Sequence, residues 1–268
     1  MTAHGDSRKS RTAPVDYDRI STSYDFGRQA GKSESRLLAK LLGPLANSCV
    51  LDAGCGTANY LLKLKDLSRL RVGLDLSEGM LGQARSKNVS ALFVRGHAVY
   101  MPFSDLSFDA AYCIQVLHHI QEKSTFMSEV YRILRPGGRF VIQSCSHEQL
   151  TTFCCYHYFK RALEVDRMRI PDLDEISGLL SDTGFTDISI HGCSVDDAFE
   201  DAPDSYLDKR VRDGVSTFGL LAEEDIQEGC ESIKRDVQSG VVSYVVEERR
   251  RKLDEIGSQA SFIRAVKS

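Results

Sequence analysis

No stretch of the 268-residue sequence approaches the roughly 20 consecutive apolar residues that cross a bilayer, so a membrane-spanning helix is not predicted. The first dozen residues are small, polar and basic without an apolar core, which argues against a secretory signal. Excess positive charge is also missing, because the formal net charge is -4, and this disfavours nucleic acid as a partner. These absences predict a cytoplasmic protein whose partners are neither membranes nor nucleic acids.

The eight cysteines include no C-x-x-C pair, which is the usual signature of a zinc site or a thioredoxin-like motif. Four of them lie in or beside apolar runs that are typical of buried strands, namely Cys49, Cys55, Cys113 and Cys145. In a reducing cytosol, buried free thiols are the expected state of such residues. No metal site is therefore predicted.

Short apolar runs alternate with helical patterns along much of the chain, as in a parallel sheet covered on both faces. The expected strands are Cys49–Ala53, Arg71–Leu76, Ala91–Arg95, Phe108–Ile114, Arg139–Ser144, Thr186–His191 and Ala260–Val266. The expected helices are Asp16–Lys40, Asn59–Leu67, Glu78–Arg85, Ser124–Leu134 and Leu173–Thr183. We predict an α/β fold with a doubly wound, mostly parallel, seven-stranded sheet.

Residues 196–258 break this alternation, because they are highly charged and contain helical stretches between the last two strands. A long insertion in a compact domain is often a lid or a substrate cap, although covering a sheet edge or forming a dimer contact would also explain it. The predicted organisation is a disordered tail over residues 1–14, an α/β core over 15–195, a helical cap over 196–258 and a final core strand over 259–268.

The most informative segment is Asp52-x-Gly54-x-Gly56, which follows the first strand. Open α/β sheets bind ligands at the carboxyl ends of their strands, and glycines there let the backbone approach a ligand closely. Asp75 ends the second strand, where it can accept hydrogen bonds from both hydroxyls of a ribose. The glycine spacing differs from the G-x-G-x-x-G of dinucleotide-binding folds, which disfavours a nicotinamide-dependent reductase.

Further motifs occur in the same order and spacing: Met101-Pro102-Phe103, Phe108-Asp109, Val116-Leu117-His118-His119-Ile120 and Leu134-Arg135-Pro136-Gly137-Gly138. With the glycine loop, they resemble the class I S-adenosylmethionine-dependent methyltransferases, especially the branch that acts on small molecules. The resemblance runs from about Tyr17 to His191. It implies a Rossmann-like fold, S-adenosyl-L-methionine as the cofactor, and in-line transfer of its methyl group to a small-molecule acceptor. A monomer and a homodimer both remain open.

The resemblance also implies which residues contact the cofactor. These are Asp52, Gly54, Cys55 and Gly56 at the methionine end, Asp75 at the ribose, Leu76, Met80, His97 and Ala98 around the adenine, and Gln115 beneath the sulfonium. In addition, Tyr17 and Tyr24 match aromatic residues that close over the cofactor. Packing of an amphipathic helix would explain these two tyrosines equally well.

Two positions depart from the family's pattern. Ala58 stands where a third glycine is common, and its methyl group is tolerable if the backbone there is helical. His97 replaces an acidic residue that often accepts a hydrogen bond from the adenine amino group. A neutral imidazole can accept that bond, so we expect cofactor affinity to fall near or below the unperturbed histidine pKa of roughly 6.5.

Three histidines are candidate catalytic bases. His118 and His119 also belong to a turn that is structural in relatives, whereas His147 lies just past the carboxyl end of a strand, where substrate groups gather. A surface position would explain His147 without any catalytic role.

Two other features bear on the acceptor. The aromatic segment 154–161 suits an apolar or aromatic acceptor under the cap, although it is equally a helix packed on the sheet edge. Arg167 and Arg169 are candidates to pair with an acidic group of the acceptor, but solvated surface charge is the simpler interpretation.

Two alternative functions fit the same sequence. A metalloid methyltransferase acting on trivalent arsenic would need three cysteines near the sulfonium, and the available ones are Cys154 and Cys155 with Cys193 or Cys230. A binding or regulatory protein that keeps the fold without catalysis is the second alternative, since Ala58 and His97 depart from the pattern.

Overall fold

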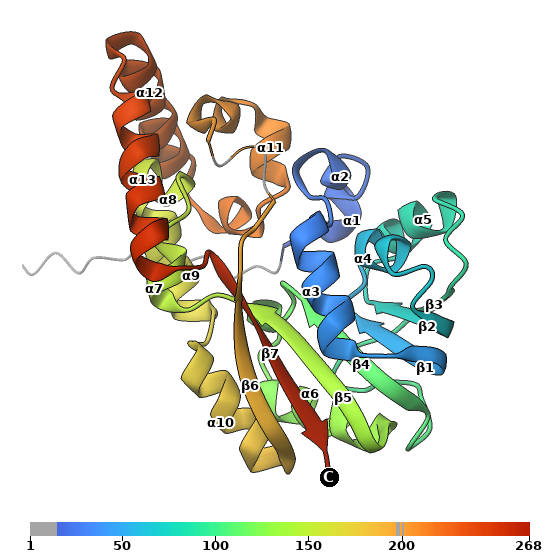
Figure 1. Ribbon diagram of the computed structural model, residues 1–268. Helices are drawn as coiled ribbons and strands as arrows, with labels where there is room; N and C mark the ends of the chain where they lie inside the picture. Colours follow the sequence, from blue (N-terminus) through green and yellow to red (C-terminus); the bar gives the residue numbers. More distant parts are fainter. Residues whose placement is uncertain (1–14, 197–198, 200) are drawn as a thin grey trace, which may run out of the picture.

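The computed structural model describes residues 15–196, 199 and 201–268, and a seven-stranded sheet with helices on both faces dominates it (Figure 1). The strand order is β3-β2-β1-β4-β5-β7-β6. The strands are β1 Leu45–Ala53, β2 Ser68–Asp75, β3 Leu92–Arg95, β4 Phe108–Ile114, β5 Leu134–Ser144, β6 Phe185–Cys193 and β7 Ala260–Lys267. Strand β7 pairs antiparallel with both β5 and β6, and the other pairs of neighbouring strands are parallel. The predicted doubly wound sheet is confirmed, whereas the predicted tail lies outside the described residues.

Two hydrophobic clusters fill the space between the sheet and its helices. One face is covered by α6 (Lys123–Ile133) and α10 (Leu173–Thr183), and the other by α3 (Lys32–Leu42), α4 (Asn59–Lys63) and α5 (Glu78–Ser86). In α6, Phe126, Val130 and Ile133 recur on one side of the helix and are fully buried. This packing holds the carboxyl ends of the strands in fixed positions.

The N-terminal segment is not the single helix over Asp16–Lys40 that the apolar spacing predicts. It forms α1 (Tyr17–Ile20), α2 (Tyr24–Gly27) and then α3. Arg28, after α2, has an extended backbone at φ -139° and ψ 114°. The Asp18 carboxylate accepts hydrogen bonds from Ser77 Oγ and from the backbone N–H of Gly79, so tertiary contacts replace the continuous helix.

Smaller differences concern the ends of elements. The helix expected over Asn59–Leu67 ends at Lys63, and β2 begins earlier than expected, at Ser68. In the strand pairing, β5 includes the Pro-Gly-Gly turn at residues 136–138, where its register against β4 shifts. Within the described part of the chain, no helix combines the length and the apolarity needed to cross a membrane.

A helical cap stands over the upper end of the sheet in Figure 1. Its elements are α8 (Cys155–Tyr158), α9 (Lys160–Arg169), η2 (Pro203–Leu207), α11 (Lys209–Asp213), η3 (Ser216–Leu220), α12 (Glu223–Ser239) and α13 (Val242–Ile256). They share a third hydrophobic cluster, in which the rings of Phe159 and Phe218 meet edge to face at 4.8 Å. Helices fill the predicted insertion, and α8 and α9, which precede residue 196, pack into the same hydrophobic cluster.

Candidate active site

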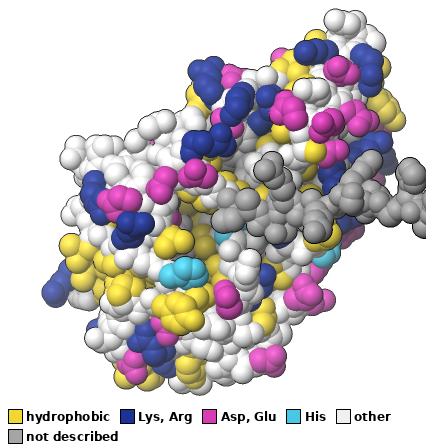
Figure 2. Space-filling model, turned by 180° about the vertical axis from the view of Figure 1, so that it is seen from behind, with side chains coloured by type: hydrophobic (Ala, Val, Ile, Leu, Met, Phe, Trp, Pro, Cys, Tyr) yellow, Lys and Arg dark blue, Asp and Glu magenta, His cyan; other side chains and the backbone are white. Residues whose placement is uncertain are grey.

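A cleft of about 1650 Å³ lies between the sheet and the cap, and a smaller cavity of about 290 Å³ adjoins it. On the face shown in Figure 2, hydrophobic side chains surround a hollow and charged side chains gather above it. Nine residues line both spaces: Tyr17, Tyr24, Gly54, Gly56, Ile114, Gln115, His118, His119 and Arg169. The two spaces therefore form one site, which extends from the glycine loop to the cap.

The glycine loop is shaped so that its backbone faces this site. Gly54 and Gly56 have φ values of +86° and +51°, in the left-handed region that favours glycine. A Cβ on Gly54 would lie 2.4 Å from Cγ2 of Val116, whereas a Cβ on Gly56 would meet no atom within 4 Å. Gly54 is thus required by packing, and Gly56 leaves open space for a ligand.

Two carboxylates flank the loop. Asp75 accepts hydrogen bonds from the backbone N–H groups of Gly56 at 2.8 Å and Ser77 at 2.9 Å, which fix its orientation. Asp52 is only 3% exposed, and burial, together with the nearby charge of Asp75, raises its pKa to about 8. Burial likewise raises the pKa of Asp75. A cationic ligand would favour ionisation of both groups.

Aromatic side chains from the N-terminal segment lie at the junction of the cleft and the cavity. The rings of Tyr17 and Tyr24 meet edge to face at 6.2 Å. Asp25, in α2, accepts hydrogen bonds from Thr57 Oγ1 at 2.6 Å and Asn59 Nδ2 at 3.0 Å, so α2 is joined to the end of the glycine loop. The N-terminal segment therefore forms one wall of the site.

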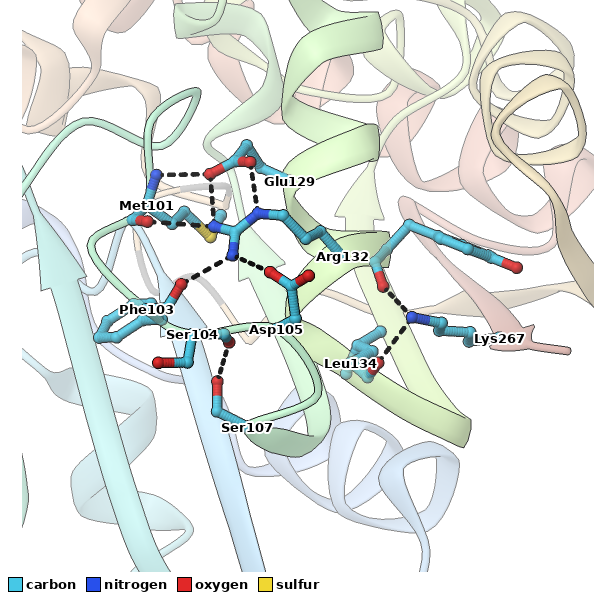
Figure 3. A network of polar contacts seen from close by, with 10 residues as sticks. Met101, Phe103, Ser104, Asp105, Ser107, Glu129, Arg132, Leu134 and Lys267 are labelled. Carbon is cyan, nitrogen blue, oxygen red and sulfur yellow. Dashed lines mark hydrogen bonds and ion pairs between the residues drawn. The ribbon is translucent and has the colours of Figure 1, made fainter.

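The segment that carries His97 and Ala98 is fixed to α6 by a polar network centred on Arg132 (Figure 3). Glu129 accepts a hydrogen bond from the backbone N–H of Met101 at 2.7 Å and pairs with Arg132. Arg132 also donates to the carbonyl oxygens of Met101 and Phe103. The adenine side of the predicted site is thereby held in place.

His97 does not present the hydrogen-bond acceptor that the sequence led us to expect. The backbone N–H of Val99 donates to Nδ1 of His97 at 3.2 Å. The neutral imidazole therefore carries its proton on Nε2, which is a donor. In this tautomer it can donate to an acceptor nitrogen of a purine but cannot accept a hydrogen bond from the amino group.

All twelve residues predicted to contact the cofactor line the cleft, the cavity or both. The candidate bases divide differently, because His118 and His119 line both spaces while His147 lines neither. Nε2 of His147 lies 2.9 Å from the carbonyl oxygen of Ile170, and its backbone N–H donates to Asp172. His147 therefore lies outside both spaces, at the start of α7 (His147–Leu150), and not beside the residues that a catalytic base would need to reach.

The two histidines at the site are poor proton acceptors. Burial, followed by the charge of Arg169, lowers the pKa of His119 to about 3. Burial and the neighbouring His119 also lower the pKa of His118 well below its usual value. Both are therefore neutral at physiological pH and can hydrogen-bond without taking up a proton.

Ala58 differs from its predicted conformation. Its backbone has φ 65° and ψ 28°, which is left-handed rather than helical, and its side chain is fully buried. The glycine that is common at this position would relieve the strain. The condition on which we expected the methyl group to be tolerated is not met, and the surrounding packing must hold Ala58 in place.

The cysteines do not form the site that a metalloid substrate would need. Cys154, Cys155 and Cys193 are buried, and only Cys155 of the four candidates lines the cavity. Burial raises the pKa of the Cys193 thiol to about 12, so it is protonated at neutral pH. Among the described residues, no group of three or more His, Cys, Asp or Glu side chains is placed to hold a metal ion.

Sequence reasoning missed Arg28 and misjudged Arg169. These two supply the cationic side chains that line the smaller cavity. Nε of Arg28 donates to the carbonyl oxygen of Gly214 in the cap at 2.9 Å. Arg169 is not a solvated surface charge, because its side chain is 16% exposed and ion-paired with Asp166. Arg28 lies in no motif, and no local pattern in the sequence marks it.

Three comparisons place these features among known proteins. A family model described as a methyltransferase domain matches residues 51–142. The chain is 27% identical to the demethylmenaquinone methyltransferase of Renibacterium salmoninarum, over 69% of this chain and 87% of that protein. It is 30% identical to the enzyme of the same name from Paenarthrobacter aurescens, over 66% and 77%. A solved structure from Anabaena variabilis, named as a methyltransferase of an antibiotic biosynthesis pathway, has a TM-score of 0.72 and 25% identity, covering 86% of this chain and 95% of that one.

Proposed function

Because the chain belongs to the class I S-adenosylmethionine-dependent methyltransferases, we propose that it methylates a small-molecule acceptor held between the sheet and the cap. The observation that carries this proposal is the set of nine residues that line both the cleft and the cavity. They join the glycine loop, where the family binds its cofactor, to a space large enough for a second molecule. The relatives named for demethylmenaquinone support an acceptor of this kind.

The residues present fit S-adenosylmethionine. The open space beside Gly56 allows close approach of a ligand to the backbone. The Asp75 carboxylate still has lone pairs free for ribose hydroxyls after accepting its two backbone bonds. Asp52 and Asp75 provide a negative environment for a ligand with a cationic sulfur and an ammonium group.

When bound, the cofactor supplies an electrophilic methyl group on sulfur, so the protein mainly has to align the two reactants and exclude water. We assign alignment to the glycine loop and to Gln115, which lines both spaces. Tyr17 and Tyr24 cover the same junction and keep water out. His118 and His119 would orient the acceptor as neutral hydrogen-bonding groups, since their lowered pKa values make them weak bases.

Calorimetric titration with S-adenosylmethionine and S-adenosylhomocysteine, with NADH as the negative control, tests the cofactor assignment. Methyl transfer is then followed with labelled S-adenosylmethionine and a panel of hydroxylated aromatic acceptors. We expect micromolar binding of both sulfur compounds, no binding of NADH, and labelled product from at least one acceptor. Absence of binding by both sulfur compounds would overturn the proposal.

A matched pair of variants locates the binding site. Gly56→Ala and Gly82→Ala each add one methyl group where no protein atom lies within 4 Å. Only Gly56 borders the cleft and the cavity, whereas Gly82 lies on α5. We expect Gly56→Ala to abolish cofactor binding while the protein stays folded, and Gly82→Ala to bind like the wild type.

A further inference from the structure

Arg169 differs from the other residues of the site in its origin and in its charge. Of the nine residues that line both the cleft and the cavity, it is the only one that the cap supplies and the only one with a permanent positive charge. The other eight come from the N-terminal segment, the glycine loop, the end of β4 and the 3-10 turn that follows β4. A cationic side chain is thus brought from α9 to the point where the cofactor and acceptor spaces meet.

The guanidinium of Arg169 is held in one orientation. Its Nε donates to Asp166 at 2.5 Å, and its Nη2 donates to Ser216 at 2.7 Å and Thr217 at 2.8 Å. Asp166 is only 2% exposed and also accepts a hydrogen bond from Tyr156. No hydrogen bond from Nη1 to any described residue is present. One edge of a fixed guanidinium therefore remains available to a ligand.

The neighbouring charges have other partners. Arg161 pairs with Glu164 at the rim of the cleft. The carboxylates Glu223, Glu224 and Asp225 lie in the first turn of α12, where they interact favourably with the helix dipole. Lys123 and Lys160 also line the cleft and Arg28 lines the cavity, but among the described lysines and arginines only Arg169 lines both spaces.

We propose that Arg169 binds an anionic oxygen of the acceptor, so that the acceptor is an apolar molecule bearing a carboxylate or an ionised hydroxyl close to the atom that is methylated. This inference rests on the proposed function. An apolar body is expected because the cleft around this point is lined by Val116, Ile120, Val165, Met168, Leu220 and Leu221. A guanidinium suits the anion, since its planar donors match the geometry of a carboxylate.

The chemistry of the site agrees with this assignment. Because burial lowers the pKa values of His118 and His119, both are weak bases and are poorly suited to remove a proton from the acceptor. An acceptor that arrives already ionised needs no such base. A positive charge beside it would favour the ionised form by lowering the pKa of the acceptor's hydroxyl.

The test compares two probes with the same ring system, 3-hydroxy-2-naphthoate and its methyl ester. Each is titrated into the full-length protein saturated with S-adenosylhomocysteine, and each is offered as an acceptor of labelled methyl groups. We expect the acid to bind on the order of 10- to 100-fold more tightly than the neutral ester, as for hydrogen bonds to charged groups. Arg169→Lys should reduce the preference for the acid to a few-fold. Lysine keeps a positive charge near Asp166 but lacks the several planar N–H donors of a guanidinium.

Two further variants separate acceptor binding from folding. Arg169→Met combined with Asp166→Asn removes the pair without leaving a buried carboxylate unpaired, and it should abolish the preference for the acid. Arg167→Met changes an exposed arginine of the same helix that lines neither space, and the preference should be unchanged. If Arg169 had only a structural role, replacing it would weaken the binding of both probes equally, and the ratio of their affinities would not change.

The outcomes distinguish the inference from the function on which it rests. If S-adenosylhomocysteine binds but the acid and the ester bind equally, or neither binds, the inference is overturned and the proposed function stands. A preference that survives in both Arg169 variants also overturns it. If the wild-type protein does not bind S-adenosylhomocysteine, the proposed function itself fails.

Discussion

The phenol oxygen of Tyr17 lies 2.7 Å from Nε2 of His119, although 102 positions separate the two residues in the sequence. The rings also meet edge to face, with centroids 5.3 Å apart. This contact joins α1 to the 3-10 turn η1 (Leu117–His119) across the cleft. Burial raises the pKa of Tyr17, and burial lowers that of His119, so the pair stays neutral throughout the physiological range.

Replacing Tyr17 by Phe removes the hydrogen bond to His119 while the aromatic ring remains in place. A neutral hydrogen bond contributes about 0.5–1.5 kcal/mol, so we expect S-adenosylhomocysteine to bind about 2- to 10-fold more weakly. Calorimetric titration measures the change. Tyr244→Phe on α13 is the control, because Tyr244 is 62% exposed and lines neither space. Equal affinities for the two variants would show that the bond to His119 does not contribute to binding.

Asp52 should release a proton when the cofactor binds. Its pKa of about 8 means that it is largely protonated in the free protein at pH 6.5, and a cationic ligand favours the ionised form. Affinity should therefore rise with pH between 6 and 8. Titrations in phosphate and in Tris at pH 6.5 give different apparent enthalpies if a proton is released, and Asp52→Asn should remove that difference.

Without the cofactor, Asp52 has the opposite effect: it makes the free energy of unfolding fall as the pH rises. The pKa of Asp52 is raised by burial in the folded state, above an unfolded value of about 3.9. Between these values the folded state binds more protons, so this contribution to the free energy of unfolding falls as the pH rises. The free energy of unfolding of Asp52→Asn should lack this pH-dependent contribution, which urea denaturation at several pH values would measure.

Much of the cofactor side of the site follows from local sequence. Asp52, Gly54 and Gly56 sit directly after a buried run, and the parallel sheet brings the end of β2 with Asp75 beside them. Chain order alone therefore brings these residues together. The predicted residues of the glycine loop and of the strand ends border the site for this reason, whereas Tyr17 and Tyr24 reach it from α1 and α2 through tertiary contacts.

The side of the site that the cap forms could not be predicted in this way. Arg169 takes its orientation from Ser216 and Thr217, which lie 47 and 48 positions further along the chain in a different helix. His147 was predicted as a base because it follows β5, but its Nε2 lies 2.9 Å from the carbonyl oxygen of Ile170 and it lines neither space. Long-range contacts of this kind leave no periodic trace in the sequence.

Ala58→Gly should be nearly neutral for stability. A left-handed backbone costs a non-glycine residue about 1–2 kcal/mol, and loss of a buried methyl group costs about 0.8 kcal/mol, so the two effects largely cancel. Ala39→Gly, in the interior of α3, should cost about 1 kcal/mol because no such strain is relieved there. Urea denaturation of both variants tests this difference. A loss for Ala58→Gly that equals or exceeds that of Ala39→Gly would contradict the assigned strain.

Arg132→Met should destabilise the protein and weaken cofactor binding together, since Arg132 fixes the segment between His97 and Asp105 to α6. Its guanidinium bonds to two carbonyl oxygens and two carboxylates, those of Glu129 and Asp105 (Figure 3). Hydrogen bonds to charged groups contribute about 1.5–3 kcal/mol each, and water can replace some of those that Arg132 makes. We therefore expect the free energy of unfolding to fall by about 2–3 kcal/mol. Affinity for S-adenosylhomocysteine should fall several-fold, because the wall of the cleft at His97 and Ala98 is released.

The pH dependence of the stability of Arg132→Met distinguishes loss of the charged network from loss of packing alone. The hydrogen bond from Arg132 is the main reason that the pKa of Glu129 is lowered. The stabilisation is therefore present above the unfolded Glu value of about 4.3 and is lost as the pH falls through the lower folded value. The difference in unfolding free energy between wild type and Arg132→Met should shrink in that range, whereas loss of packing alone would give a constant difference. Arg251→Met, which removes two exposed ion pairs on α13, should change neither stability nor affinity by more than about 0.5 kcal/mol.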